Sequence, residues 1–346
     1  MKMKKVNLGI IGLGGMGNYH AKSLKTGMED VEILAAADTD RNRTKQFTKK
    51  YRIKYSFADY HQLLDVEEID AVLICLPTFL HAEVVVSAAK KGKGIFCEKP
   101  IAMNLKDAER MTKSCQENRV KFMIGFVRRF DNFWGKAREI VKKGILGRPV
   151  IWHDTASSTG APYPWYFDKE KGGGPLIDGA VHNYDFAYYT FGEAKKVYAT
   201  TKTFKKNISG IDTGSAIIEY KSGDEHVISW SWGLPKGSFG GGLTDIIGPK
   251  GALLFPGSFD PVEVPKSIAQ EKYGVFCLLR KGGKKEWIKY RKNDMFFDEI
   301  FHFVNCIKKN RQVKVSGKDG KRALRVGLAI LQSGQTHLPV EIKGVL

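Results

Sequence analysis

A histidine between carboxylates stands near the middle of the 346-residue chain. Asp178 precedes His182 by four positions and Asp185 follows it by three, so a helix through this segment would place all three side chains on one face. An imidazole accepts a proton readily near neutral pH, and a carboxylate one turn away can orient its ring. A capped helix explains an isolated pair of this kind equally well, with Asp178 favouring the helix dipole and His182 half-buried.

Two neighbouring features favour an acid–base centre over a capped helix. Three consecutive glycines at 172–174 precede Asp178, and glycines allow a backbone and a ligand to come close. Lys99, within Glu98-Lys99-Pro100, could reach the same cleft and stabilise negative charge on a substrate oxygen, an effect worth about 3–4 kcal/mol in a water-poor site. The alternative for Lys99 is an ordinary surface lysine. Asp185 is expected to be structural.

A phosphate-binding pattern opens the chain. Residues 12–17 read Gly-Leu-Gly-Gly-Met-Gly and follow an apolar run at 6–11, which predicts a buried strand. Such glycines make a tight turn and let the backbone approach a pyrophosphate at the N-terminus of the next helix. Asp38 ends a second apolar run at the spacing of an acid that binds an adenosine ribose. The predicted cofactor contacts here are Gly12, Gly14, Gly15, Met16 and Asp38.

The identity of the dinucleotide depends on Asp38. A carboxylate at the end of the second strand favours the free ribose hydroxyls of NAD and repels a 2′-phosphate. Arg41 and Arg43 follow closely and could accommodate that phosphate instead. The sequence therefore predicts NAD and leaves NADP as the alternative.

Strands and helices alternate through residues 1–125. Strands are expected at 6–11, 31–37, 71–76, 94–97 and 120–125, with 51–55 as a short strand or an extended link, and helices at 19–24, 41–50, 60–64, 81–91 and 105–118. This alternation predicts an α/β fold with a parallel, doubly wound sheet, which binds ligands beyond the carboxyl ends of its strands. Leu76, Pro77, Glu98 and Lys99 lie at such ends and are further candidates for cofactor binding.

The pattern changes from about residue 150. Consecutive strands are expected at 149–157, 197–204, 212–221, 225–232 and 243–248, near residues 253, 276 and 287, and at 339–342, with helices in 172–191 and at 296–308 and 321–332. Tight turns and few helices predict an open, mainly antiparallel sheet in a second, α+β domain. The predicted domains are residues 1–125 and 126–346. Arg128 and Trp165 are candidates for substrate contact, with ordinary packing as the alternative.

Composition limits the class of protein. The formal net charge is +19, yet the basic pairs are spread along the chain without a nucleic-acid-binding signature, which favours a lysine-rich surface over a nucleic-acid partner. No apolar run reaches the length of a membrane span, and the basic start is expected to lead into a mature strand rather than to be a signal peptide. Five scattered cysteines without C-x-x-C spacing predict neither disulfides nor a metal site, and favour the cytoplasm.

Three motifs together carry a family resemblance. The glycine pattern at 12–17, Glu98-Lys99-Pro100 and the run G-G-G-x-x-x-D-x-x-x-H-x-x-D at 172–185 resemble the Gfo/Idh/MocA family, named for glucose–fructose oxidoreductase, inositol dehydrogenase and rhizopine catabolism. Residues 126–131 resemble a segment of its inositol dehydrogenase branch. Thr78 departs from the family's usual asparagine, which affects one expected cofactor contact.

The resemblance implies a Rossmann domain and a substrate domain whose sheet mediates dimers or tetramers. It also implies NAD- or NADP-dependent oxidation of a sugar or cyclic polyol, with Lys99, Asp178 and His182 as the catalytic group. In that reaction His182 would take the hydroxyl proton, and a hydride would pass from the secondary alcohol to nicotinamide. Lys99 and His182 are expected to meet over the same nicotinamide. A non-enzymatic sugar or nucleotide sensor on the same fold is the alternative.

Overall fold

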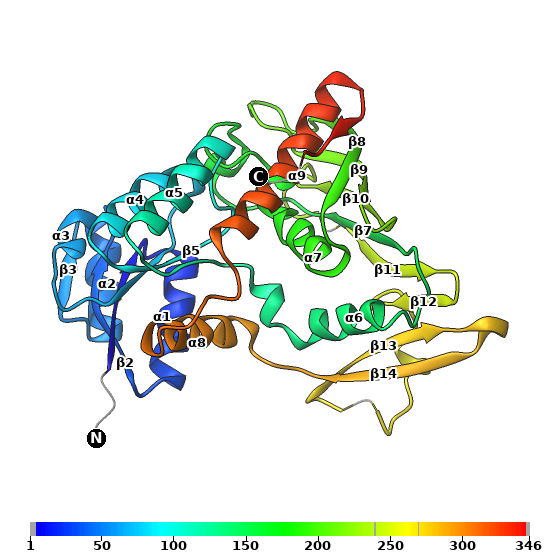
Figure 1. The fold of residues 1–346 in the computed structure, drawn as a ribbon, viewed down its shortest axis with the longest axis horizontal. Coiled ribbons are helices and arrows are strands. Elements are labelled where there is room, and N and C mark those ends of the chain that lie inside the picture. Colours follow the sequence, from blue (N-terminus) through cyan, green and yellow to red (C-terminus); the bar gives the residue numbers. More distant parts are fainter. Residues whose placement is uncertain (1–4, 239, 269, 344–346) are drawn as a thin grey trace. The chain divides into compact units, whose positions relative to one another are not determined.

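The computed structural model describes residues 5–238, 240–268 and 270–343, and the chain divides into two compact units (Figure 1). The first unit runs to Phe130 and also contains Asp294–Lys321; the second contains Asp131–Asn293 and continues from Arg322. The predicted single boundary after residue 125 differs from this division, because 126–130 and 294–321 contact the first unit. Residues 1–4, most of the basic start considered above, lie outside the described residues.

The first unit is built on a six-stranded parallel sheet. Its spatial order is β3 (Tyr55–Phe57), β2 (Val31–Ala37), β1 (Val6–Ile11), β4 (Ala71–Ile74), β5 (Gly94–Cys97) and β6 (Phe122–Ile124). Strands β4 and β5 are buried along their whole length, which explains why they read as continuous apolar runs. The predicted doubly wound sheet is confirmed. At 51–55, where a short strand or an extended link is expected, Tyr51 ends a helix and the strand begins only at Tyr55.

Six helices of the first unit flank this sheet in the part of the chain that the structure describes. They are α1 (Gly15–Gly27), α2 (Arg41–Tyr51), α3 (Tyr60–Leu64), α4 (His81–Lys90), α5 (Leu105–Glu117) and α8 (Met295–Lys308). Helices α4 and α5 run side by side, and α1 packs against α8 (Figure 1). Side-chain caps set several starts: Asp40 accepts a hydrogen bond from Arg43 N, and Asn104 accepts one from Asp107 N.

The second unit contains a nine-stranded, mainly antiparallel sheet, as predicted. Its spatial order is β14 (Lys285–Arg291), β13 (Tyr273–Leu279), β12 (Gly251–Leu254), β11 (Gly242–Gly248), β7 (Ile151–Ser157), β10 (Glu225–Ser231), β9 (Thr213–Tyr220), β8 (Ala194–Lys202) and β15 (Val340–Glu341). Only the β7–β10 pair is parallel among the described strands of this sheet. Burial alternates along β9, so one face of the sheet packs against a core and the other is more exposed.

Helices α6 (Asn132–Lys142) and α7 (Val181–Phe191) belong to the second unit, and α9 (Gly317–Thr336) begins in the first unit and ends in the second. The core of the second unit is aromatic: Trp152 of β7 contacts Phe186 of α7 edge to face. Two short elements precede α7, namely the 3-10 turn η3 (Pro164–Phe167) and the one-turn π-helix η4 (Pro175–Gly179). Within the described ranges, no helix combines the length and apolar character that crossing a bilayer requires.

Candidate functional site

The glycine turn joins β1 to α1, and its glycines have different surroundings. Gly12 has φ +89°, and a Cβ there would lie 2.5 Å from the backbone oxygen of Cys75. A Cβ on Gly17 would lie 2.2 Å from the oxygen of Gly12. These two glycines therefore allow the tight turn and the close packing of α1 on the sheet. Around Gly14 and Gly15, by contrast, no atom of the described residues lies within 4 Å of an added Cβ, apart from the glycine, its chain neighbours and the backbone of its own helix.

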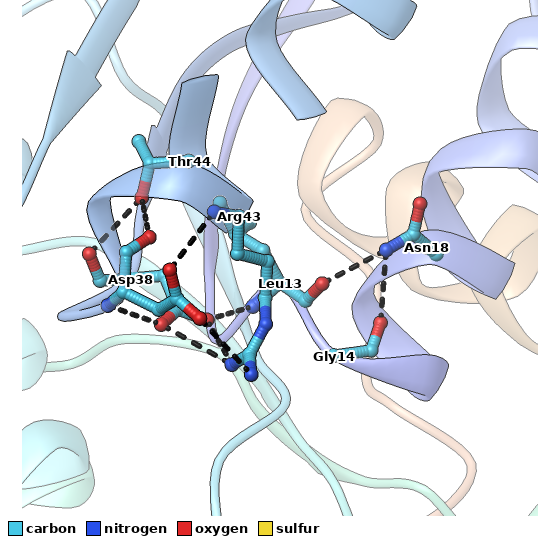
Figure 2. Close-up of polar contacts among 7 residues, drawn as sticks. Leu13, Gly14, Asn18, Asp38, Arg43 and Thr44 are labelled. Carbon is cyan, nitrogen blue, oxygen red and sulfur yellow. Dashed lines mark hydrogen bonds and ion pairs between the residues drawn. The ribbon is translucent and has the colours of Figure 1, made fainter. Parts of the chain in front are cut away.

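The open space over Gly14 and Gly15 lies at the N-terminus of α1. Gly14 is the N-cap, and no described side chain caps the helix there. The Asn18 amide instead binds the carbonyl oxygens of Leu13 and Gly14, at 2.8 and 3.1 Å (Figure 2). Met16 lies in the first turn and is partly exposed. Uncapped backbone N–H groups beside open space fit the pyrophosphate of a dinucleotide.

Asp38 follows β2 and is bound from three directions (Figure 2). Its Oδ2 accepts a hydrogen bond from the backbone N–H of Leu13 at 2.9 Å, which ties the glycine turn to the end of β2. Its Oδ1 accepts one from the backbone N–H of Asp40 at 2.9 Å. The exposed Arg43 guanidinium donates to Oδ2 at 3.0 Å. The carboxylate is thus held at the end of β2, where the sequence predicts a ribose contact, with a cation beside it.

The other predicted cofactor residues follow β4 and β5 at the same edge of the sheet. Leu76 and Pro77 come two and three residues after the last residue of β4, and both are partly exposed. Glu98 and Lys99 come directly after β5. The strand order changes direction between β1 and β4, the point at which sheets of this kind bind dinucleotides. Thr78, which replaces the expected asparagine, is buried and 3% exposed.

The acid–histidine pair of the second unit differs from the expected single α-helix. Asp178 lies in the π-turn η4, where its N–H donates to the oxygen of Gly174 at 2.9 Å, and it is 4% exposed. His182 is the second residue of α7 and is partly exposed. The expected single α-helix is therefore replaced by a π-turn at Asp178, and the expectation that Asp178 and His182 share one face stays a prediction. π-turns are rare and frequently occur at functional sites. Asp185 is buried in α7, in line with a structural role.

The glycines at 172–174 do not provide the open approach expected from the sequence. A Cβ on Gly172 would lie 2.5 Å from the Cα of Tyr166, and one on Gly174 would lie 2.0 Å from the oxygen of Ile211. A Cβ on Gly173 would lie 2.8 Å from the Ile177 side chain. The protein's own chain fills this space. These glycines serve local packing, and the inference that they admit a ligand is corrected.

The remaining predicted substrate residues fall in different units. Arg128 lies in the turn η2 (Val127–Phe130) of the first unit, like Lys99. Trp165 lies in η3 of the second unit, like Asp178 and His182, and stacks on Tyr166 with ring centroids 3.7 Å apart. The structure therefore brings the predicted cofactor residues together on one sheet edge, and divides the predicted catalytic and substrate residues between the two units.

Sequence reasoning missed several residues beside these positions. Trp230 and Trp232 of the second unit both lie against Gly179, with ring atoms within 3 Å of an added Cβ. Their spacing of two residues within the strand expected at 225–232 was a usable signal, because an extended chain places both on one face. Asn183, next to His182, donates a hydrogen bond to the buried Asp154 of β7. The two residues are 29 positions apart, and no local sequence pattern predicts their contact.

Comparison with known proteins covers nearly the whole chain. Residues 6–126 match the model of an oxidoreductase family with an NAD-binding Rossmann fold, and residues 134–254 match the GFO/IDH/MocA C-terminal domain. The chain is 30% identical to the myo-inositol 2-dehydrogenase of Thermotoga maritima, covering 99% of this chain and 100% of that protein. It is 28% identical to the NAD(+)-dependent scyllo-inositol 2-dehydrogenase of Bacillus subtilis, covering 98% and 96% of the two chains.

A solved structure agrees with these matches. The crystal structure of a probable dehydrogenase from Thermotoga maritima superimposes with a TM-score of 0.78 at 29% identity, over 97% of this chain and 98% of that one. The predicted family, the predicted oxidoreductase class and the predicted NAD cofactor are confirmed by these comparisons. The chain belongs to the Gfo/Idh/MocA oxidoreductase family and carries its NAD-binding Rossmann domain.

Proposed function

We propose that this protein is a dehydrogenase that oxidises a secondary alcohol of a cyclic polyol of the inositol type. One structural observation carries the proposal: the open turn at Gly14 and Gly15, the bound Asp38 and Lys99 all follow strands that end at one sheet edge. The substrate class is supported by the two inositol dehydrogenases, which align over at least 96% of their own lengths.

The residues that would hold NAD fall into three groups. Gly12, Gly14, Gly15 and Met16 would face the pyrophosphate, and Asp38 would accept hydrogen bonds from the adenosine ribose. The segments after β4 and β5, which contain Leu76, Pro77, Glu98 and Lys99, would line the nicotinamide half. Bound NAD supplies the hydride acceptor.

Lys99, Asp178 and His182 are proposed as the catalytic group. The Lys99 ammonium would donate a hydrogen bond to the substrate oxygen and stabilise the negative charge that develops there. The partly exposed His182 imidazole would take the hydroxyl proton, and the Asp178 carboxylate would orient that ring. Arg128 and Trp165 would contact the substrate. The aromatic face of Trp165 is suited to packing on sugar C–H groups.

The experiment is a panel of inositols, aldoses and sugar acids, followed by NADH absorbance. We expect turnover of an inositol, and we expect Lys99→Ala and His182→Ala each to lower kcat about 100-fold or more. The double variant should lose far less than the product of the two single losses, because residues of one catalytic unit are non-additive. His61→Ala, at an exposed histidine, is the control. Absence of turnover across the panel contradicts the proposal and favours a sensor, whereas a fully active Lys99→Ala contradicts the catalytic role of Lys99.

Preference for NAD over NADP is proposed to depend on Asp38. Asp38→Ser removes the charge that repels a 2′-phosphate and releases Arg43 from its ion pair with Asp38, leaving the one with Asp40, so NADP should be used about tenfold better relative to NAD. Asp38→Ser/Arg43→Ala should lose most of that gain. If the kcat/KM for NADP divided by that for NAD is the same in the two variants, Arg43 plays no part in the preference.

We also propose a homo-oligomer, a dimer or tetramer, formed through the more exposed face of the nine-stranded sheet. Apolar side chains on this sheet are exposed at Tyr198 (44%), Ile217 (45%) and Leu243 (49%), and Tyr198 is paired directly with Ile217. Adjacent exposed apolar residues mark association surfaces. Light scattering should give the mass of a dimer or tetramer, and Ile217→Asp should reduce it. A wild-type monomer contradicts this assembly.

A reducing compartment, and hence the cytoplasm, is the proposed location. All five cysteines are free, and four of them are buried. Chains that mature in oxidising compartments usually pair such residues. The proposed partner is the small-molecule substrate, without nucleic acid or membrane.

A further inference from the structure

Lys99 lies between two residues that are each bound by a fully buried histidine of the first unit. His20 comes from α1, the helix after the glycine turn, and His81 is the first residue of α4, after Leu76 and Pro77. Both imidazoles are 0% exposed. His20 binds the side chain of Glu98, and His81 binds the backbone of Pro100.

The bond from His20 is the shorter of the two. Its Nε2 lies 2.7 Å from Oε1 of Glu98, while its Nδ1 has no partner among the described residues. The other carboxylate oxygen of Glu98 accepts a hydrogen bond from the backbone N–H of Lys99 at 3.3 Å. Burial alone would raise the pKa of Glu98, but the hydrogen bond and charge of His20, with the charge of Lys99, hold that pKa below its usual value. Glu98 therefore links His20 to the Lys99 backbone as a carboxylate.

His81 contacts two predicted cofactor segments at once. Its Nδ1 lies 2.9 Å from the oxygen of Pro100, and its Nε2 lies 2.8 Å from the oxygen of Leu76. The ring thus lies between the carbonyl groups of the loops after β4 and β5. Burial lowers the pKa of His81, although both carbonyls favour the imidazolium.

We propose that His20 and His81 are positioning residues that fix the backbone of Lys99 from both sides, through Glu98 and Pro100. The inference rests on the proposed catalytic role of Lys99 and extends it. A lysine side chain is long and flexible, so its ammonium is placed reproducibly only when its backbone is held. The buried His20 ring packs edge to face on Phe96, and Glu98 is its hydrogen-bond partner among the described residues. The bond to Glu98 offsets the cost of burying this polar ring.

The test uses amide substitutions that keep one bond of each histidine. A glutamine amide can replace Nε2 and an asparagine amide can replace Nδ1. His20→Gln should therefore keep the bond to Glu98, which His20→Leu removes. His81→Asn should keep the bond to Pro100, whereas His81→Gln should keep only the bond to Leu76. Met111→Ala, a core truncation in α5, is the control for lost stability alone.

Two readouts separate positioning from general destabilisation. In the full-length enzyme, His20→Leu and His81→Gln should lower kcat at least tenfold while the affinity for NADH changes less than twofold. His20→Gln and His81→Asn should stay within about threefold of wild type in kcat, since each keeps its bond. In the protein without cofactor, hydrogen exchange of a peptide covering residues 98–105 should rise in His20→Leu and His81→Gln and stay unchanged in the other two variants and in Met111→Ala.

The outcomes that overturn the inference differ from those that overturn the proposed function. Equal loss of kcat and equal exchange in His81→Asn and His81→Gln would show that the bond to Pro100 does not matter. If kcat falls in step with the melting temperature across all variants, Met111→Ala included, both histidines act only through the stability of the core. A chain without dehydrogenase activity refutes the proposed function, and in that case the exchange measurement alone decides whether the two histidines hold the Lys99 segment.

Discussion

The two glycine runs of this protein look alike in sequence and differ in the space around them. Around Gly14 and Gly15, no atom of the described residues lies within 4 Å of an added Cβ, and the N-terminus of α1 lies beside that space. Gly174, in the second unit, has φ +75° and would place a Cβ 2.0 Å from a backbone oxygen. The first run therefore leaves open space at Gly14 and Gly15, whereas the second is packed against the chain itself.

The difference follows from what surrounds each run. A parallel strand ending in a helix N-terminus leaves backbone N–H groups at a sheet edge, where an anion can satisfy them. The glycines at 172–174 follow a compact turn whose backbone carbonyls they approach; Gly174 N–H donates to the oxygen of Tyr166 at 2.8 Å. A glycine pattern thus predicts a ligand when its strand–helix context is present, and predicts only a turn when that context is missing.

The largest effect should come from Gly174→Ala. Its positive φ costs about 1–2 kcal/mol, and the contact with the backbone of Ile211 adds about 1–3 kcal/mol, because a backbone cannot rotate away as a side chain can. The free energy of unfolding of the second unit, measured by urea denaturation, should therefore fall by about 3 kcal/mol. A loss below about 1 kcal/mol would mean that this run is not packed as described.

An intermediate effect, of a different kind, should come from Gly14→Val. The site has an ordinary φ and open space, so the free energy of unfolding should hardly change, while the affinity for NADH should fall about 10- to 100-fold, or about 1.4–2.7 kcal/mol. Fluorescence titration with NADH measures this. Gly241→Val, at another open glycine, is the matched control and should bind NADH normally. Unchanged binding in Gly14→Val would place the pyrophosphate elsewhere.

Local sequence signals predicted most of the first unit and the cofactor edge. Buried strands such as β4 form continuous apolar runs, and the glycine turn, Asp38 and Glu98-Lys99 follow strand ends as expected. Contacts between distant segments were not predictable in this way. The sequence carries no sign that 294–321 joins the first unit, or that His20 meets Glu98 across 78 positions.

The acid–histidine pair shows a second limit of sequence reasoning. A spacing of four residues is the same in an α-helix and in a π-turn followed by an α-helix, so the sequence does not distinguish the two backbones. Asp178 could be named as a candidate from the sequence, and its surroundings could not. The parallel pairing of β7 with β10 in an otherwise antiparallel sheet could not be predicted either, since tertiary packing sets the partner of a strand.

The smallest effect should come from Gly192→Ala, at the end of α7. Gly192 has φ +96°, yet no atom of the described residues lies within 4 Å of an added Cβ. This glycine therefore shares the backbone strain of Gly174 without its clash, and alanine should lower the free energy of unfolding by about 1 kcal/mol. The gap between the two variants in urea denaturation isolates the cost of the backbone contact at Ile211. Equal losses at Gly174 and Gly192 would mean that backbone conformation alone, rather than filled space, distinguishes the second glycine run from the first.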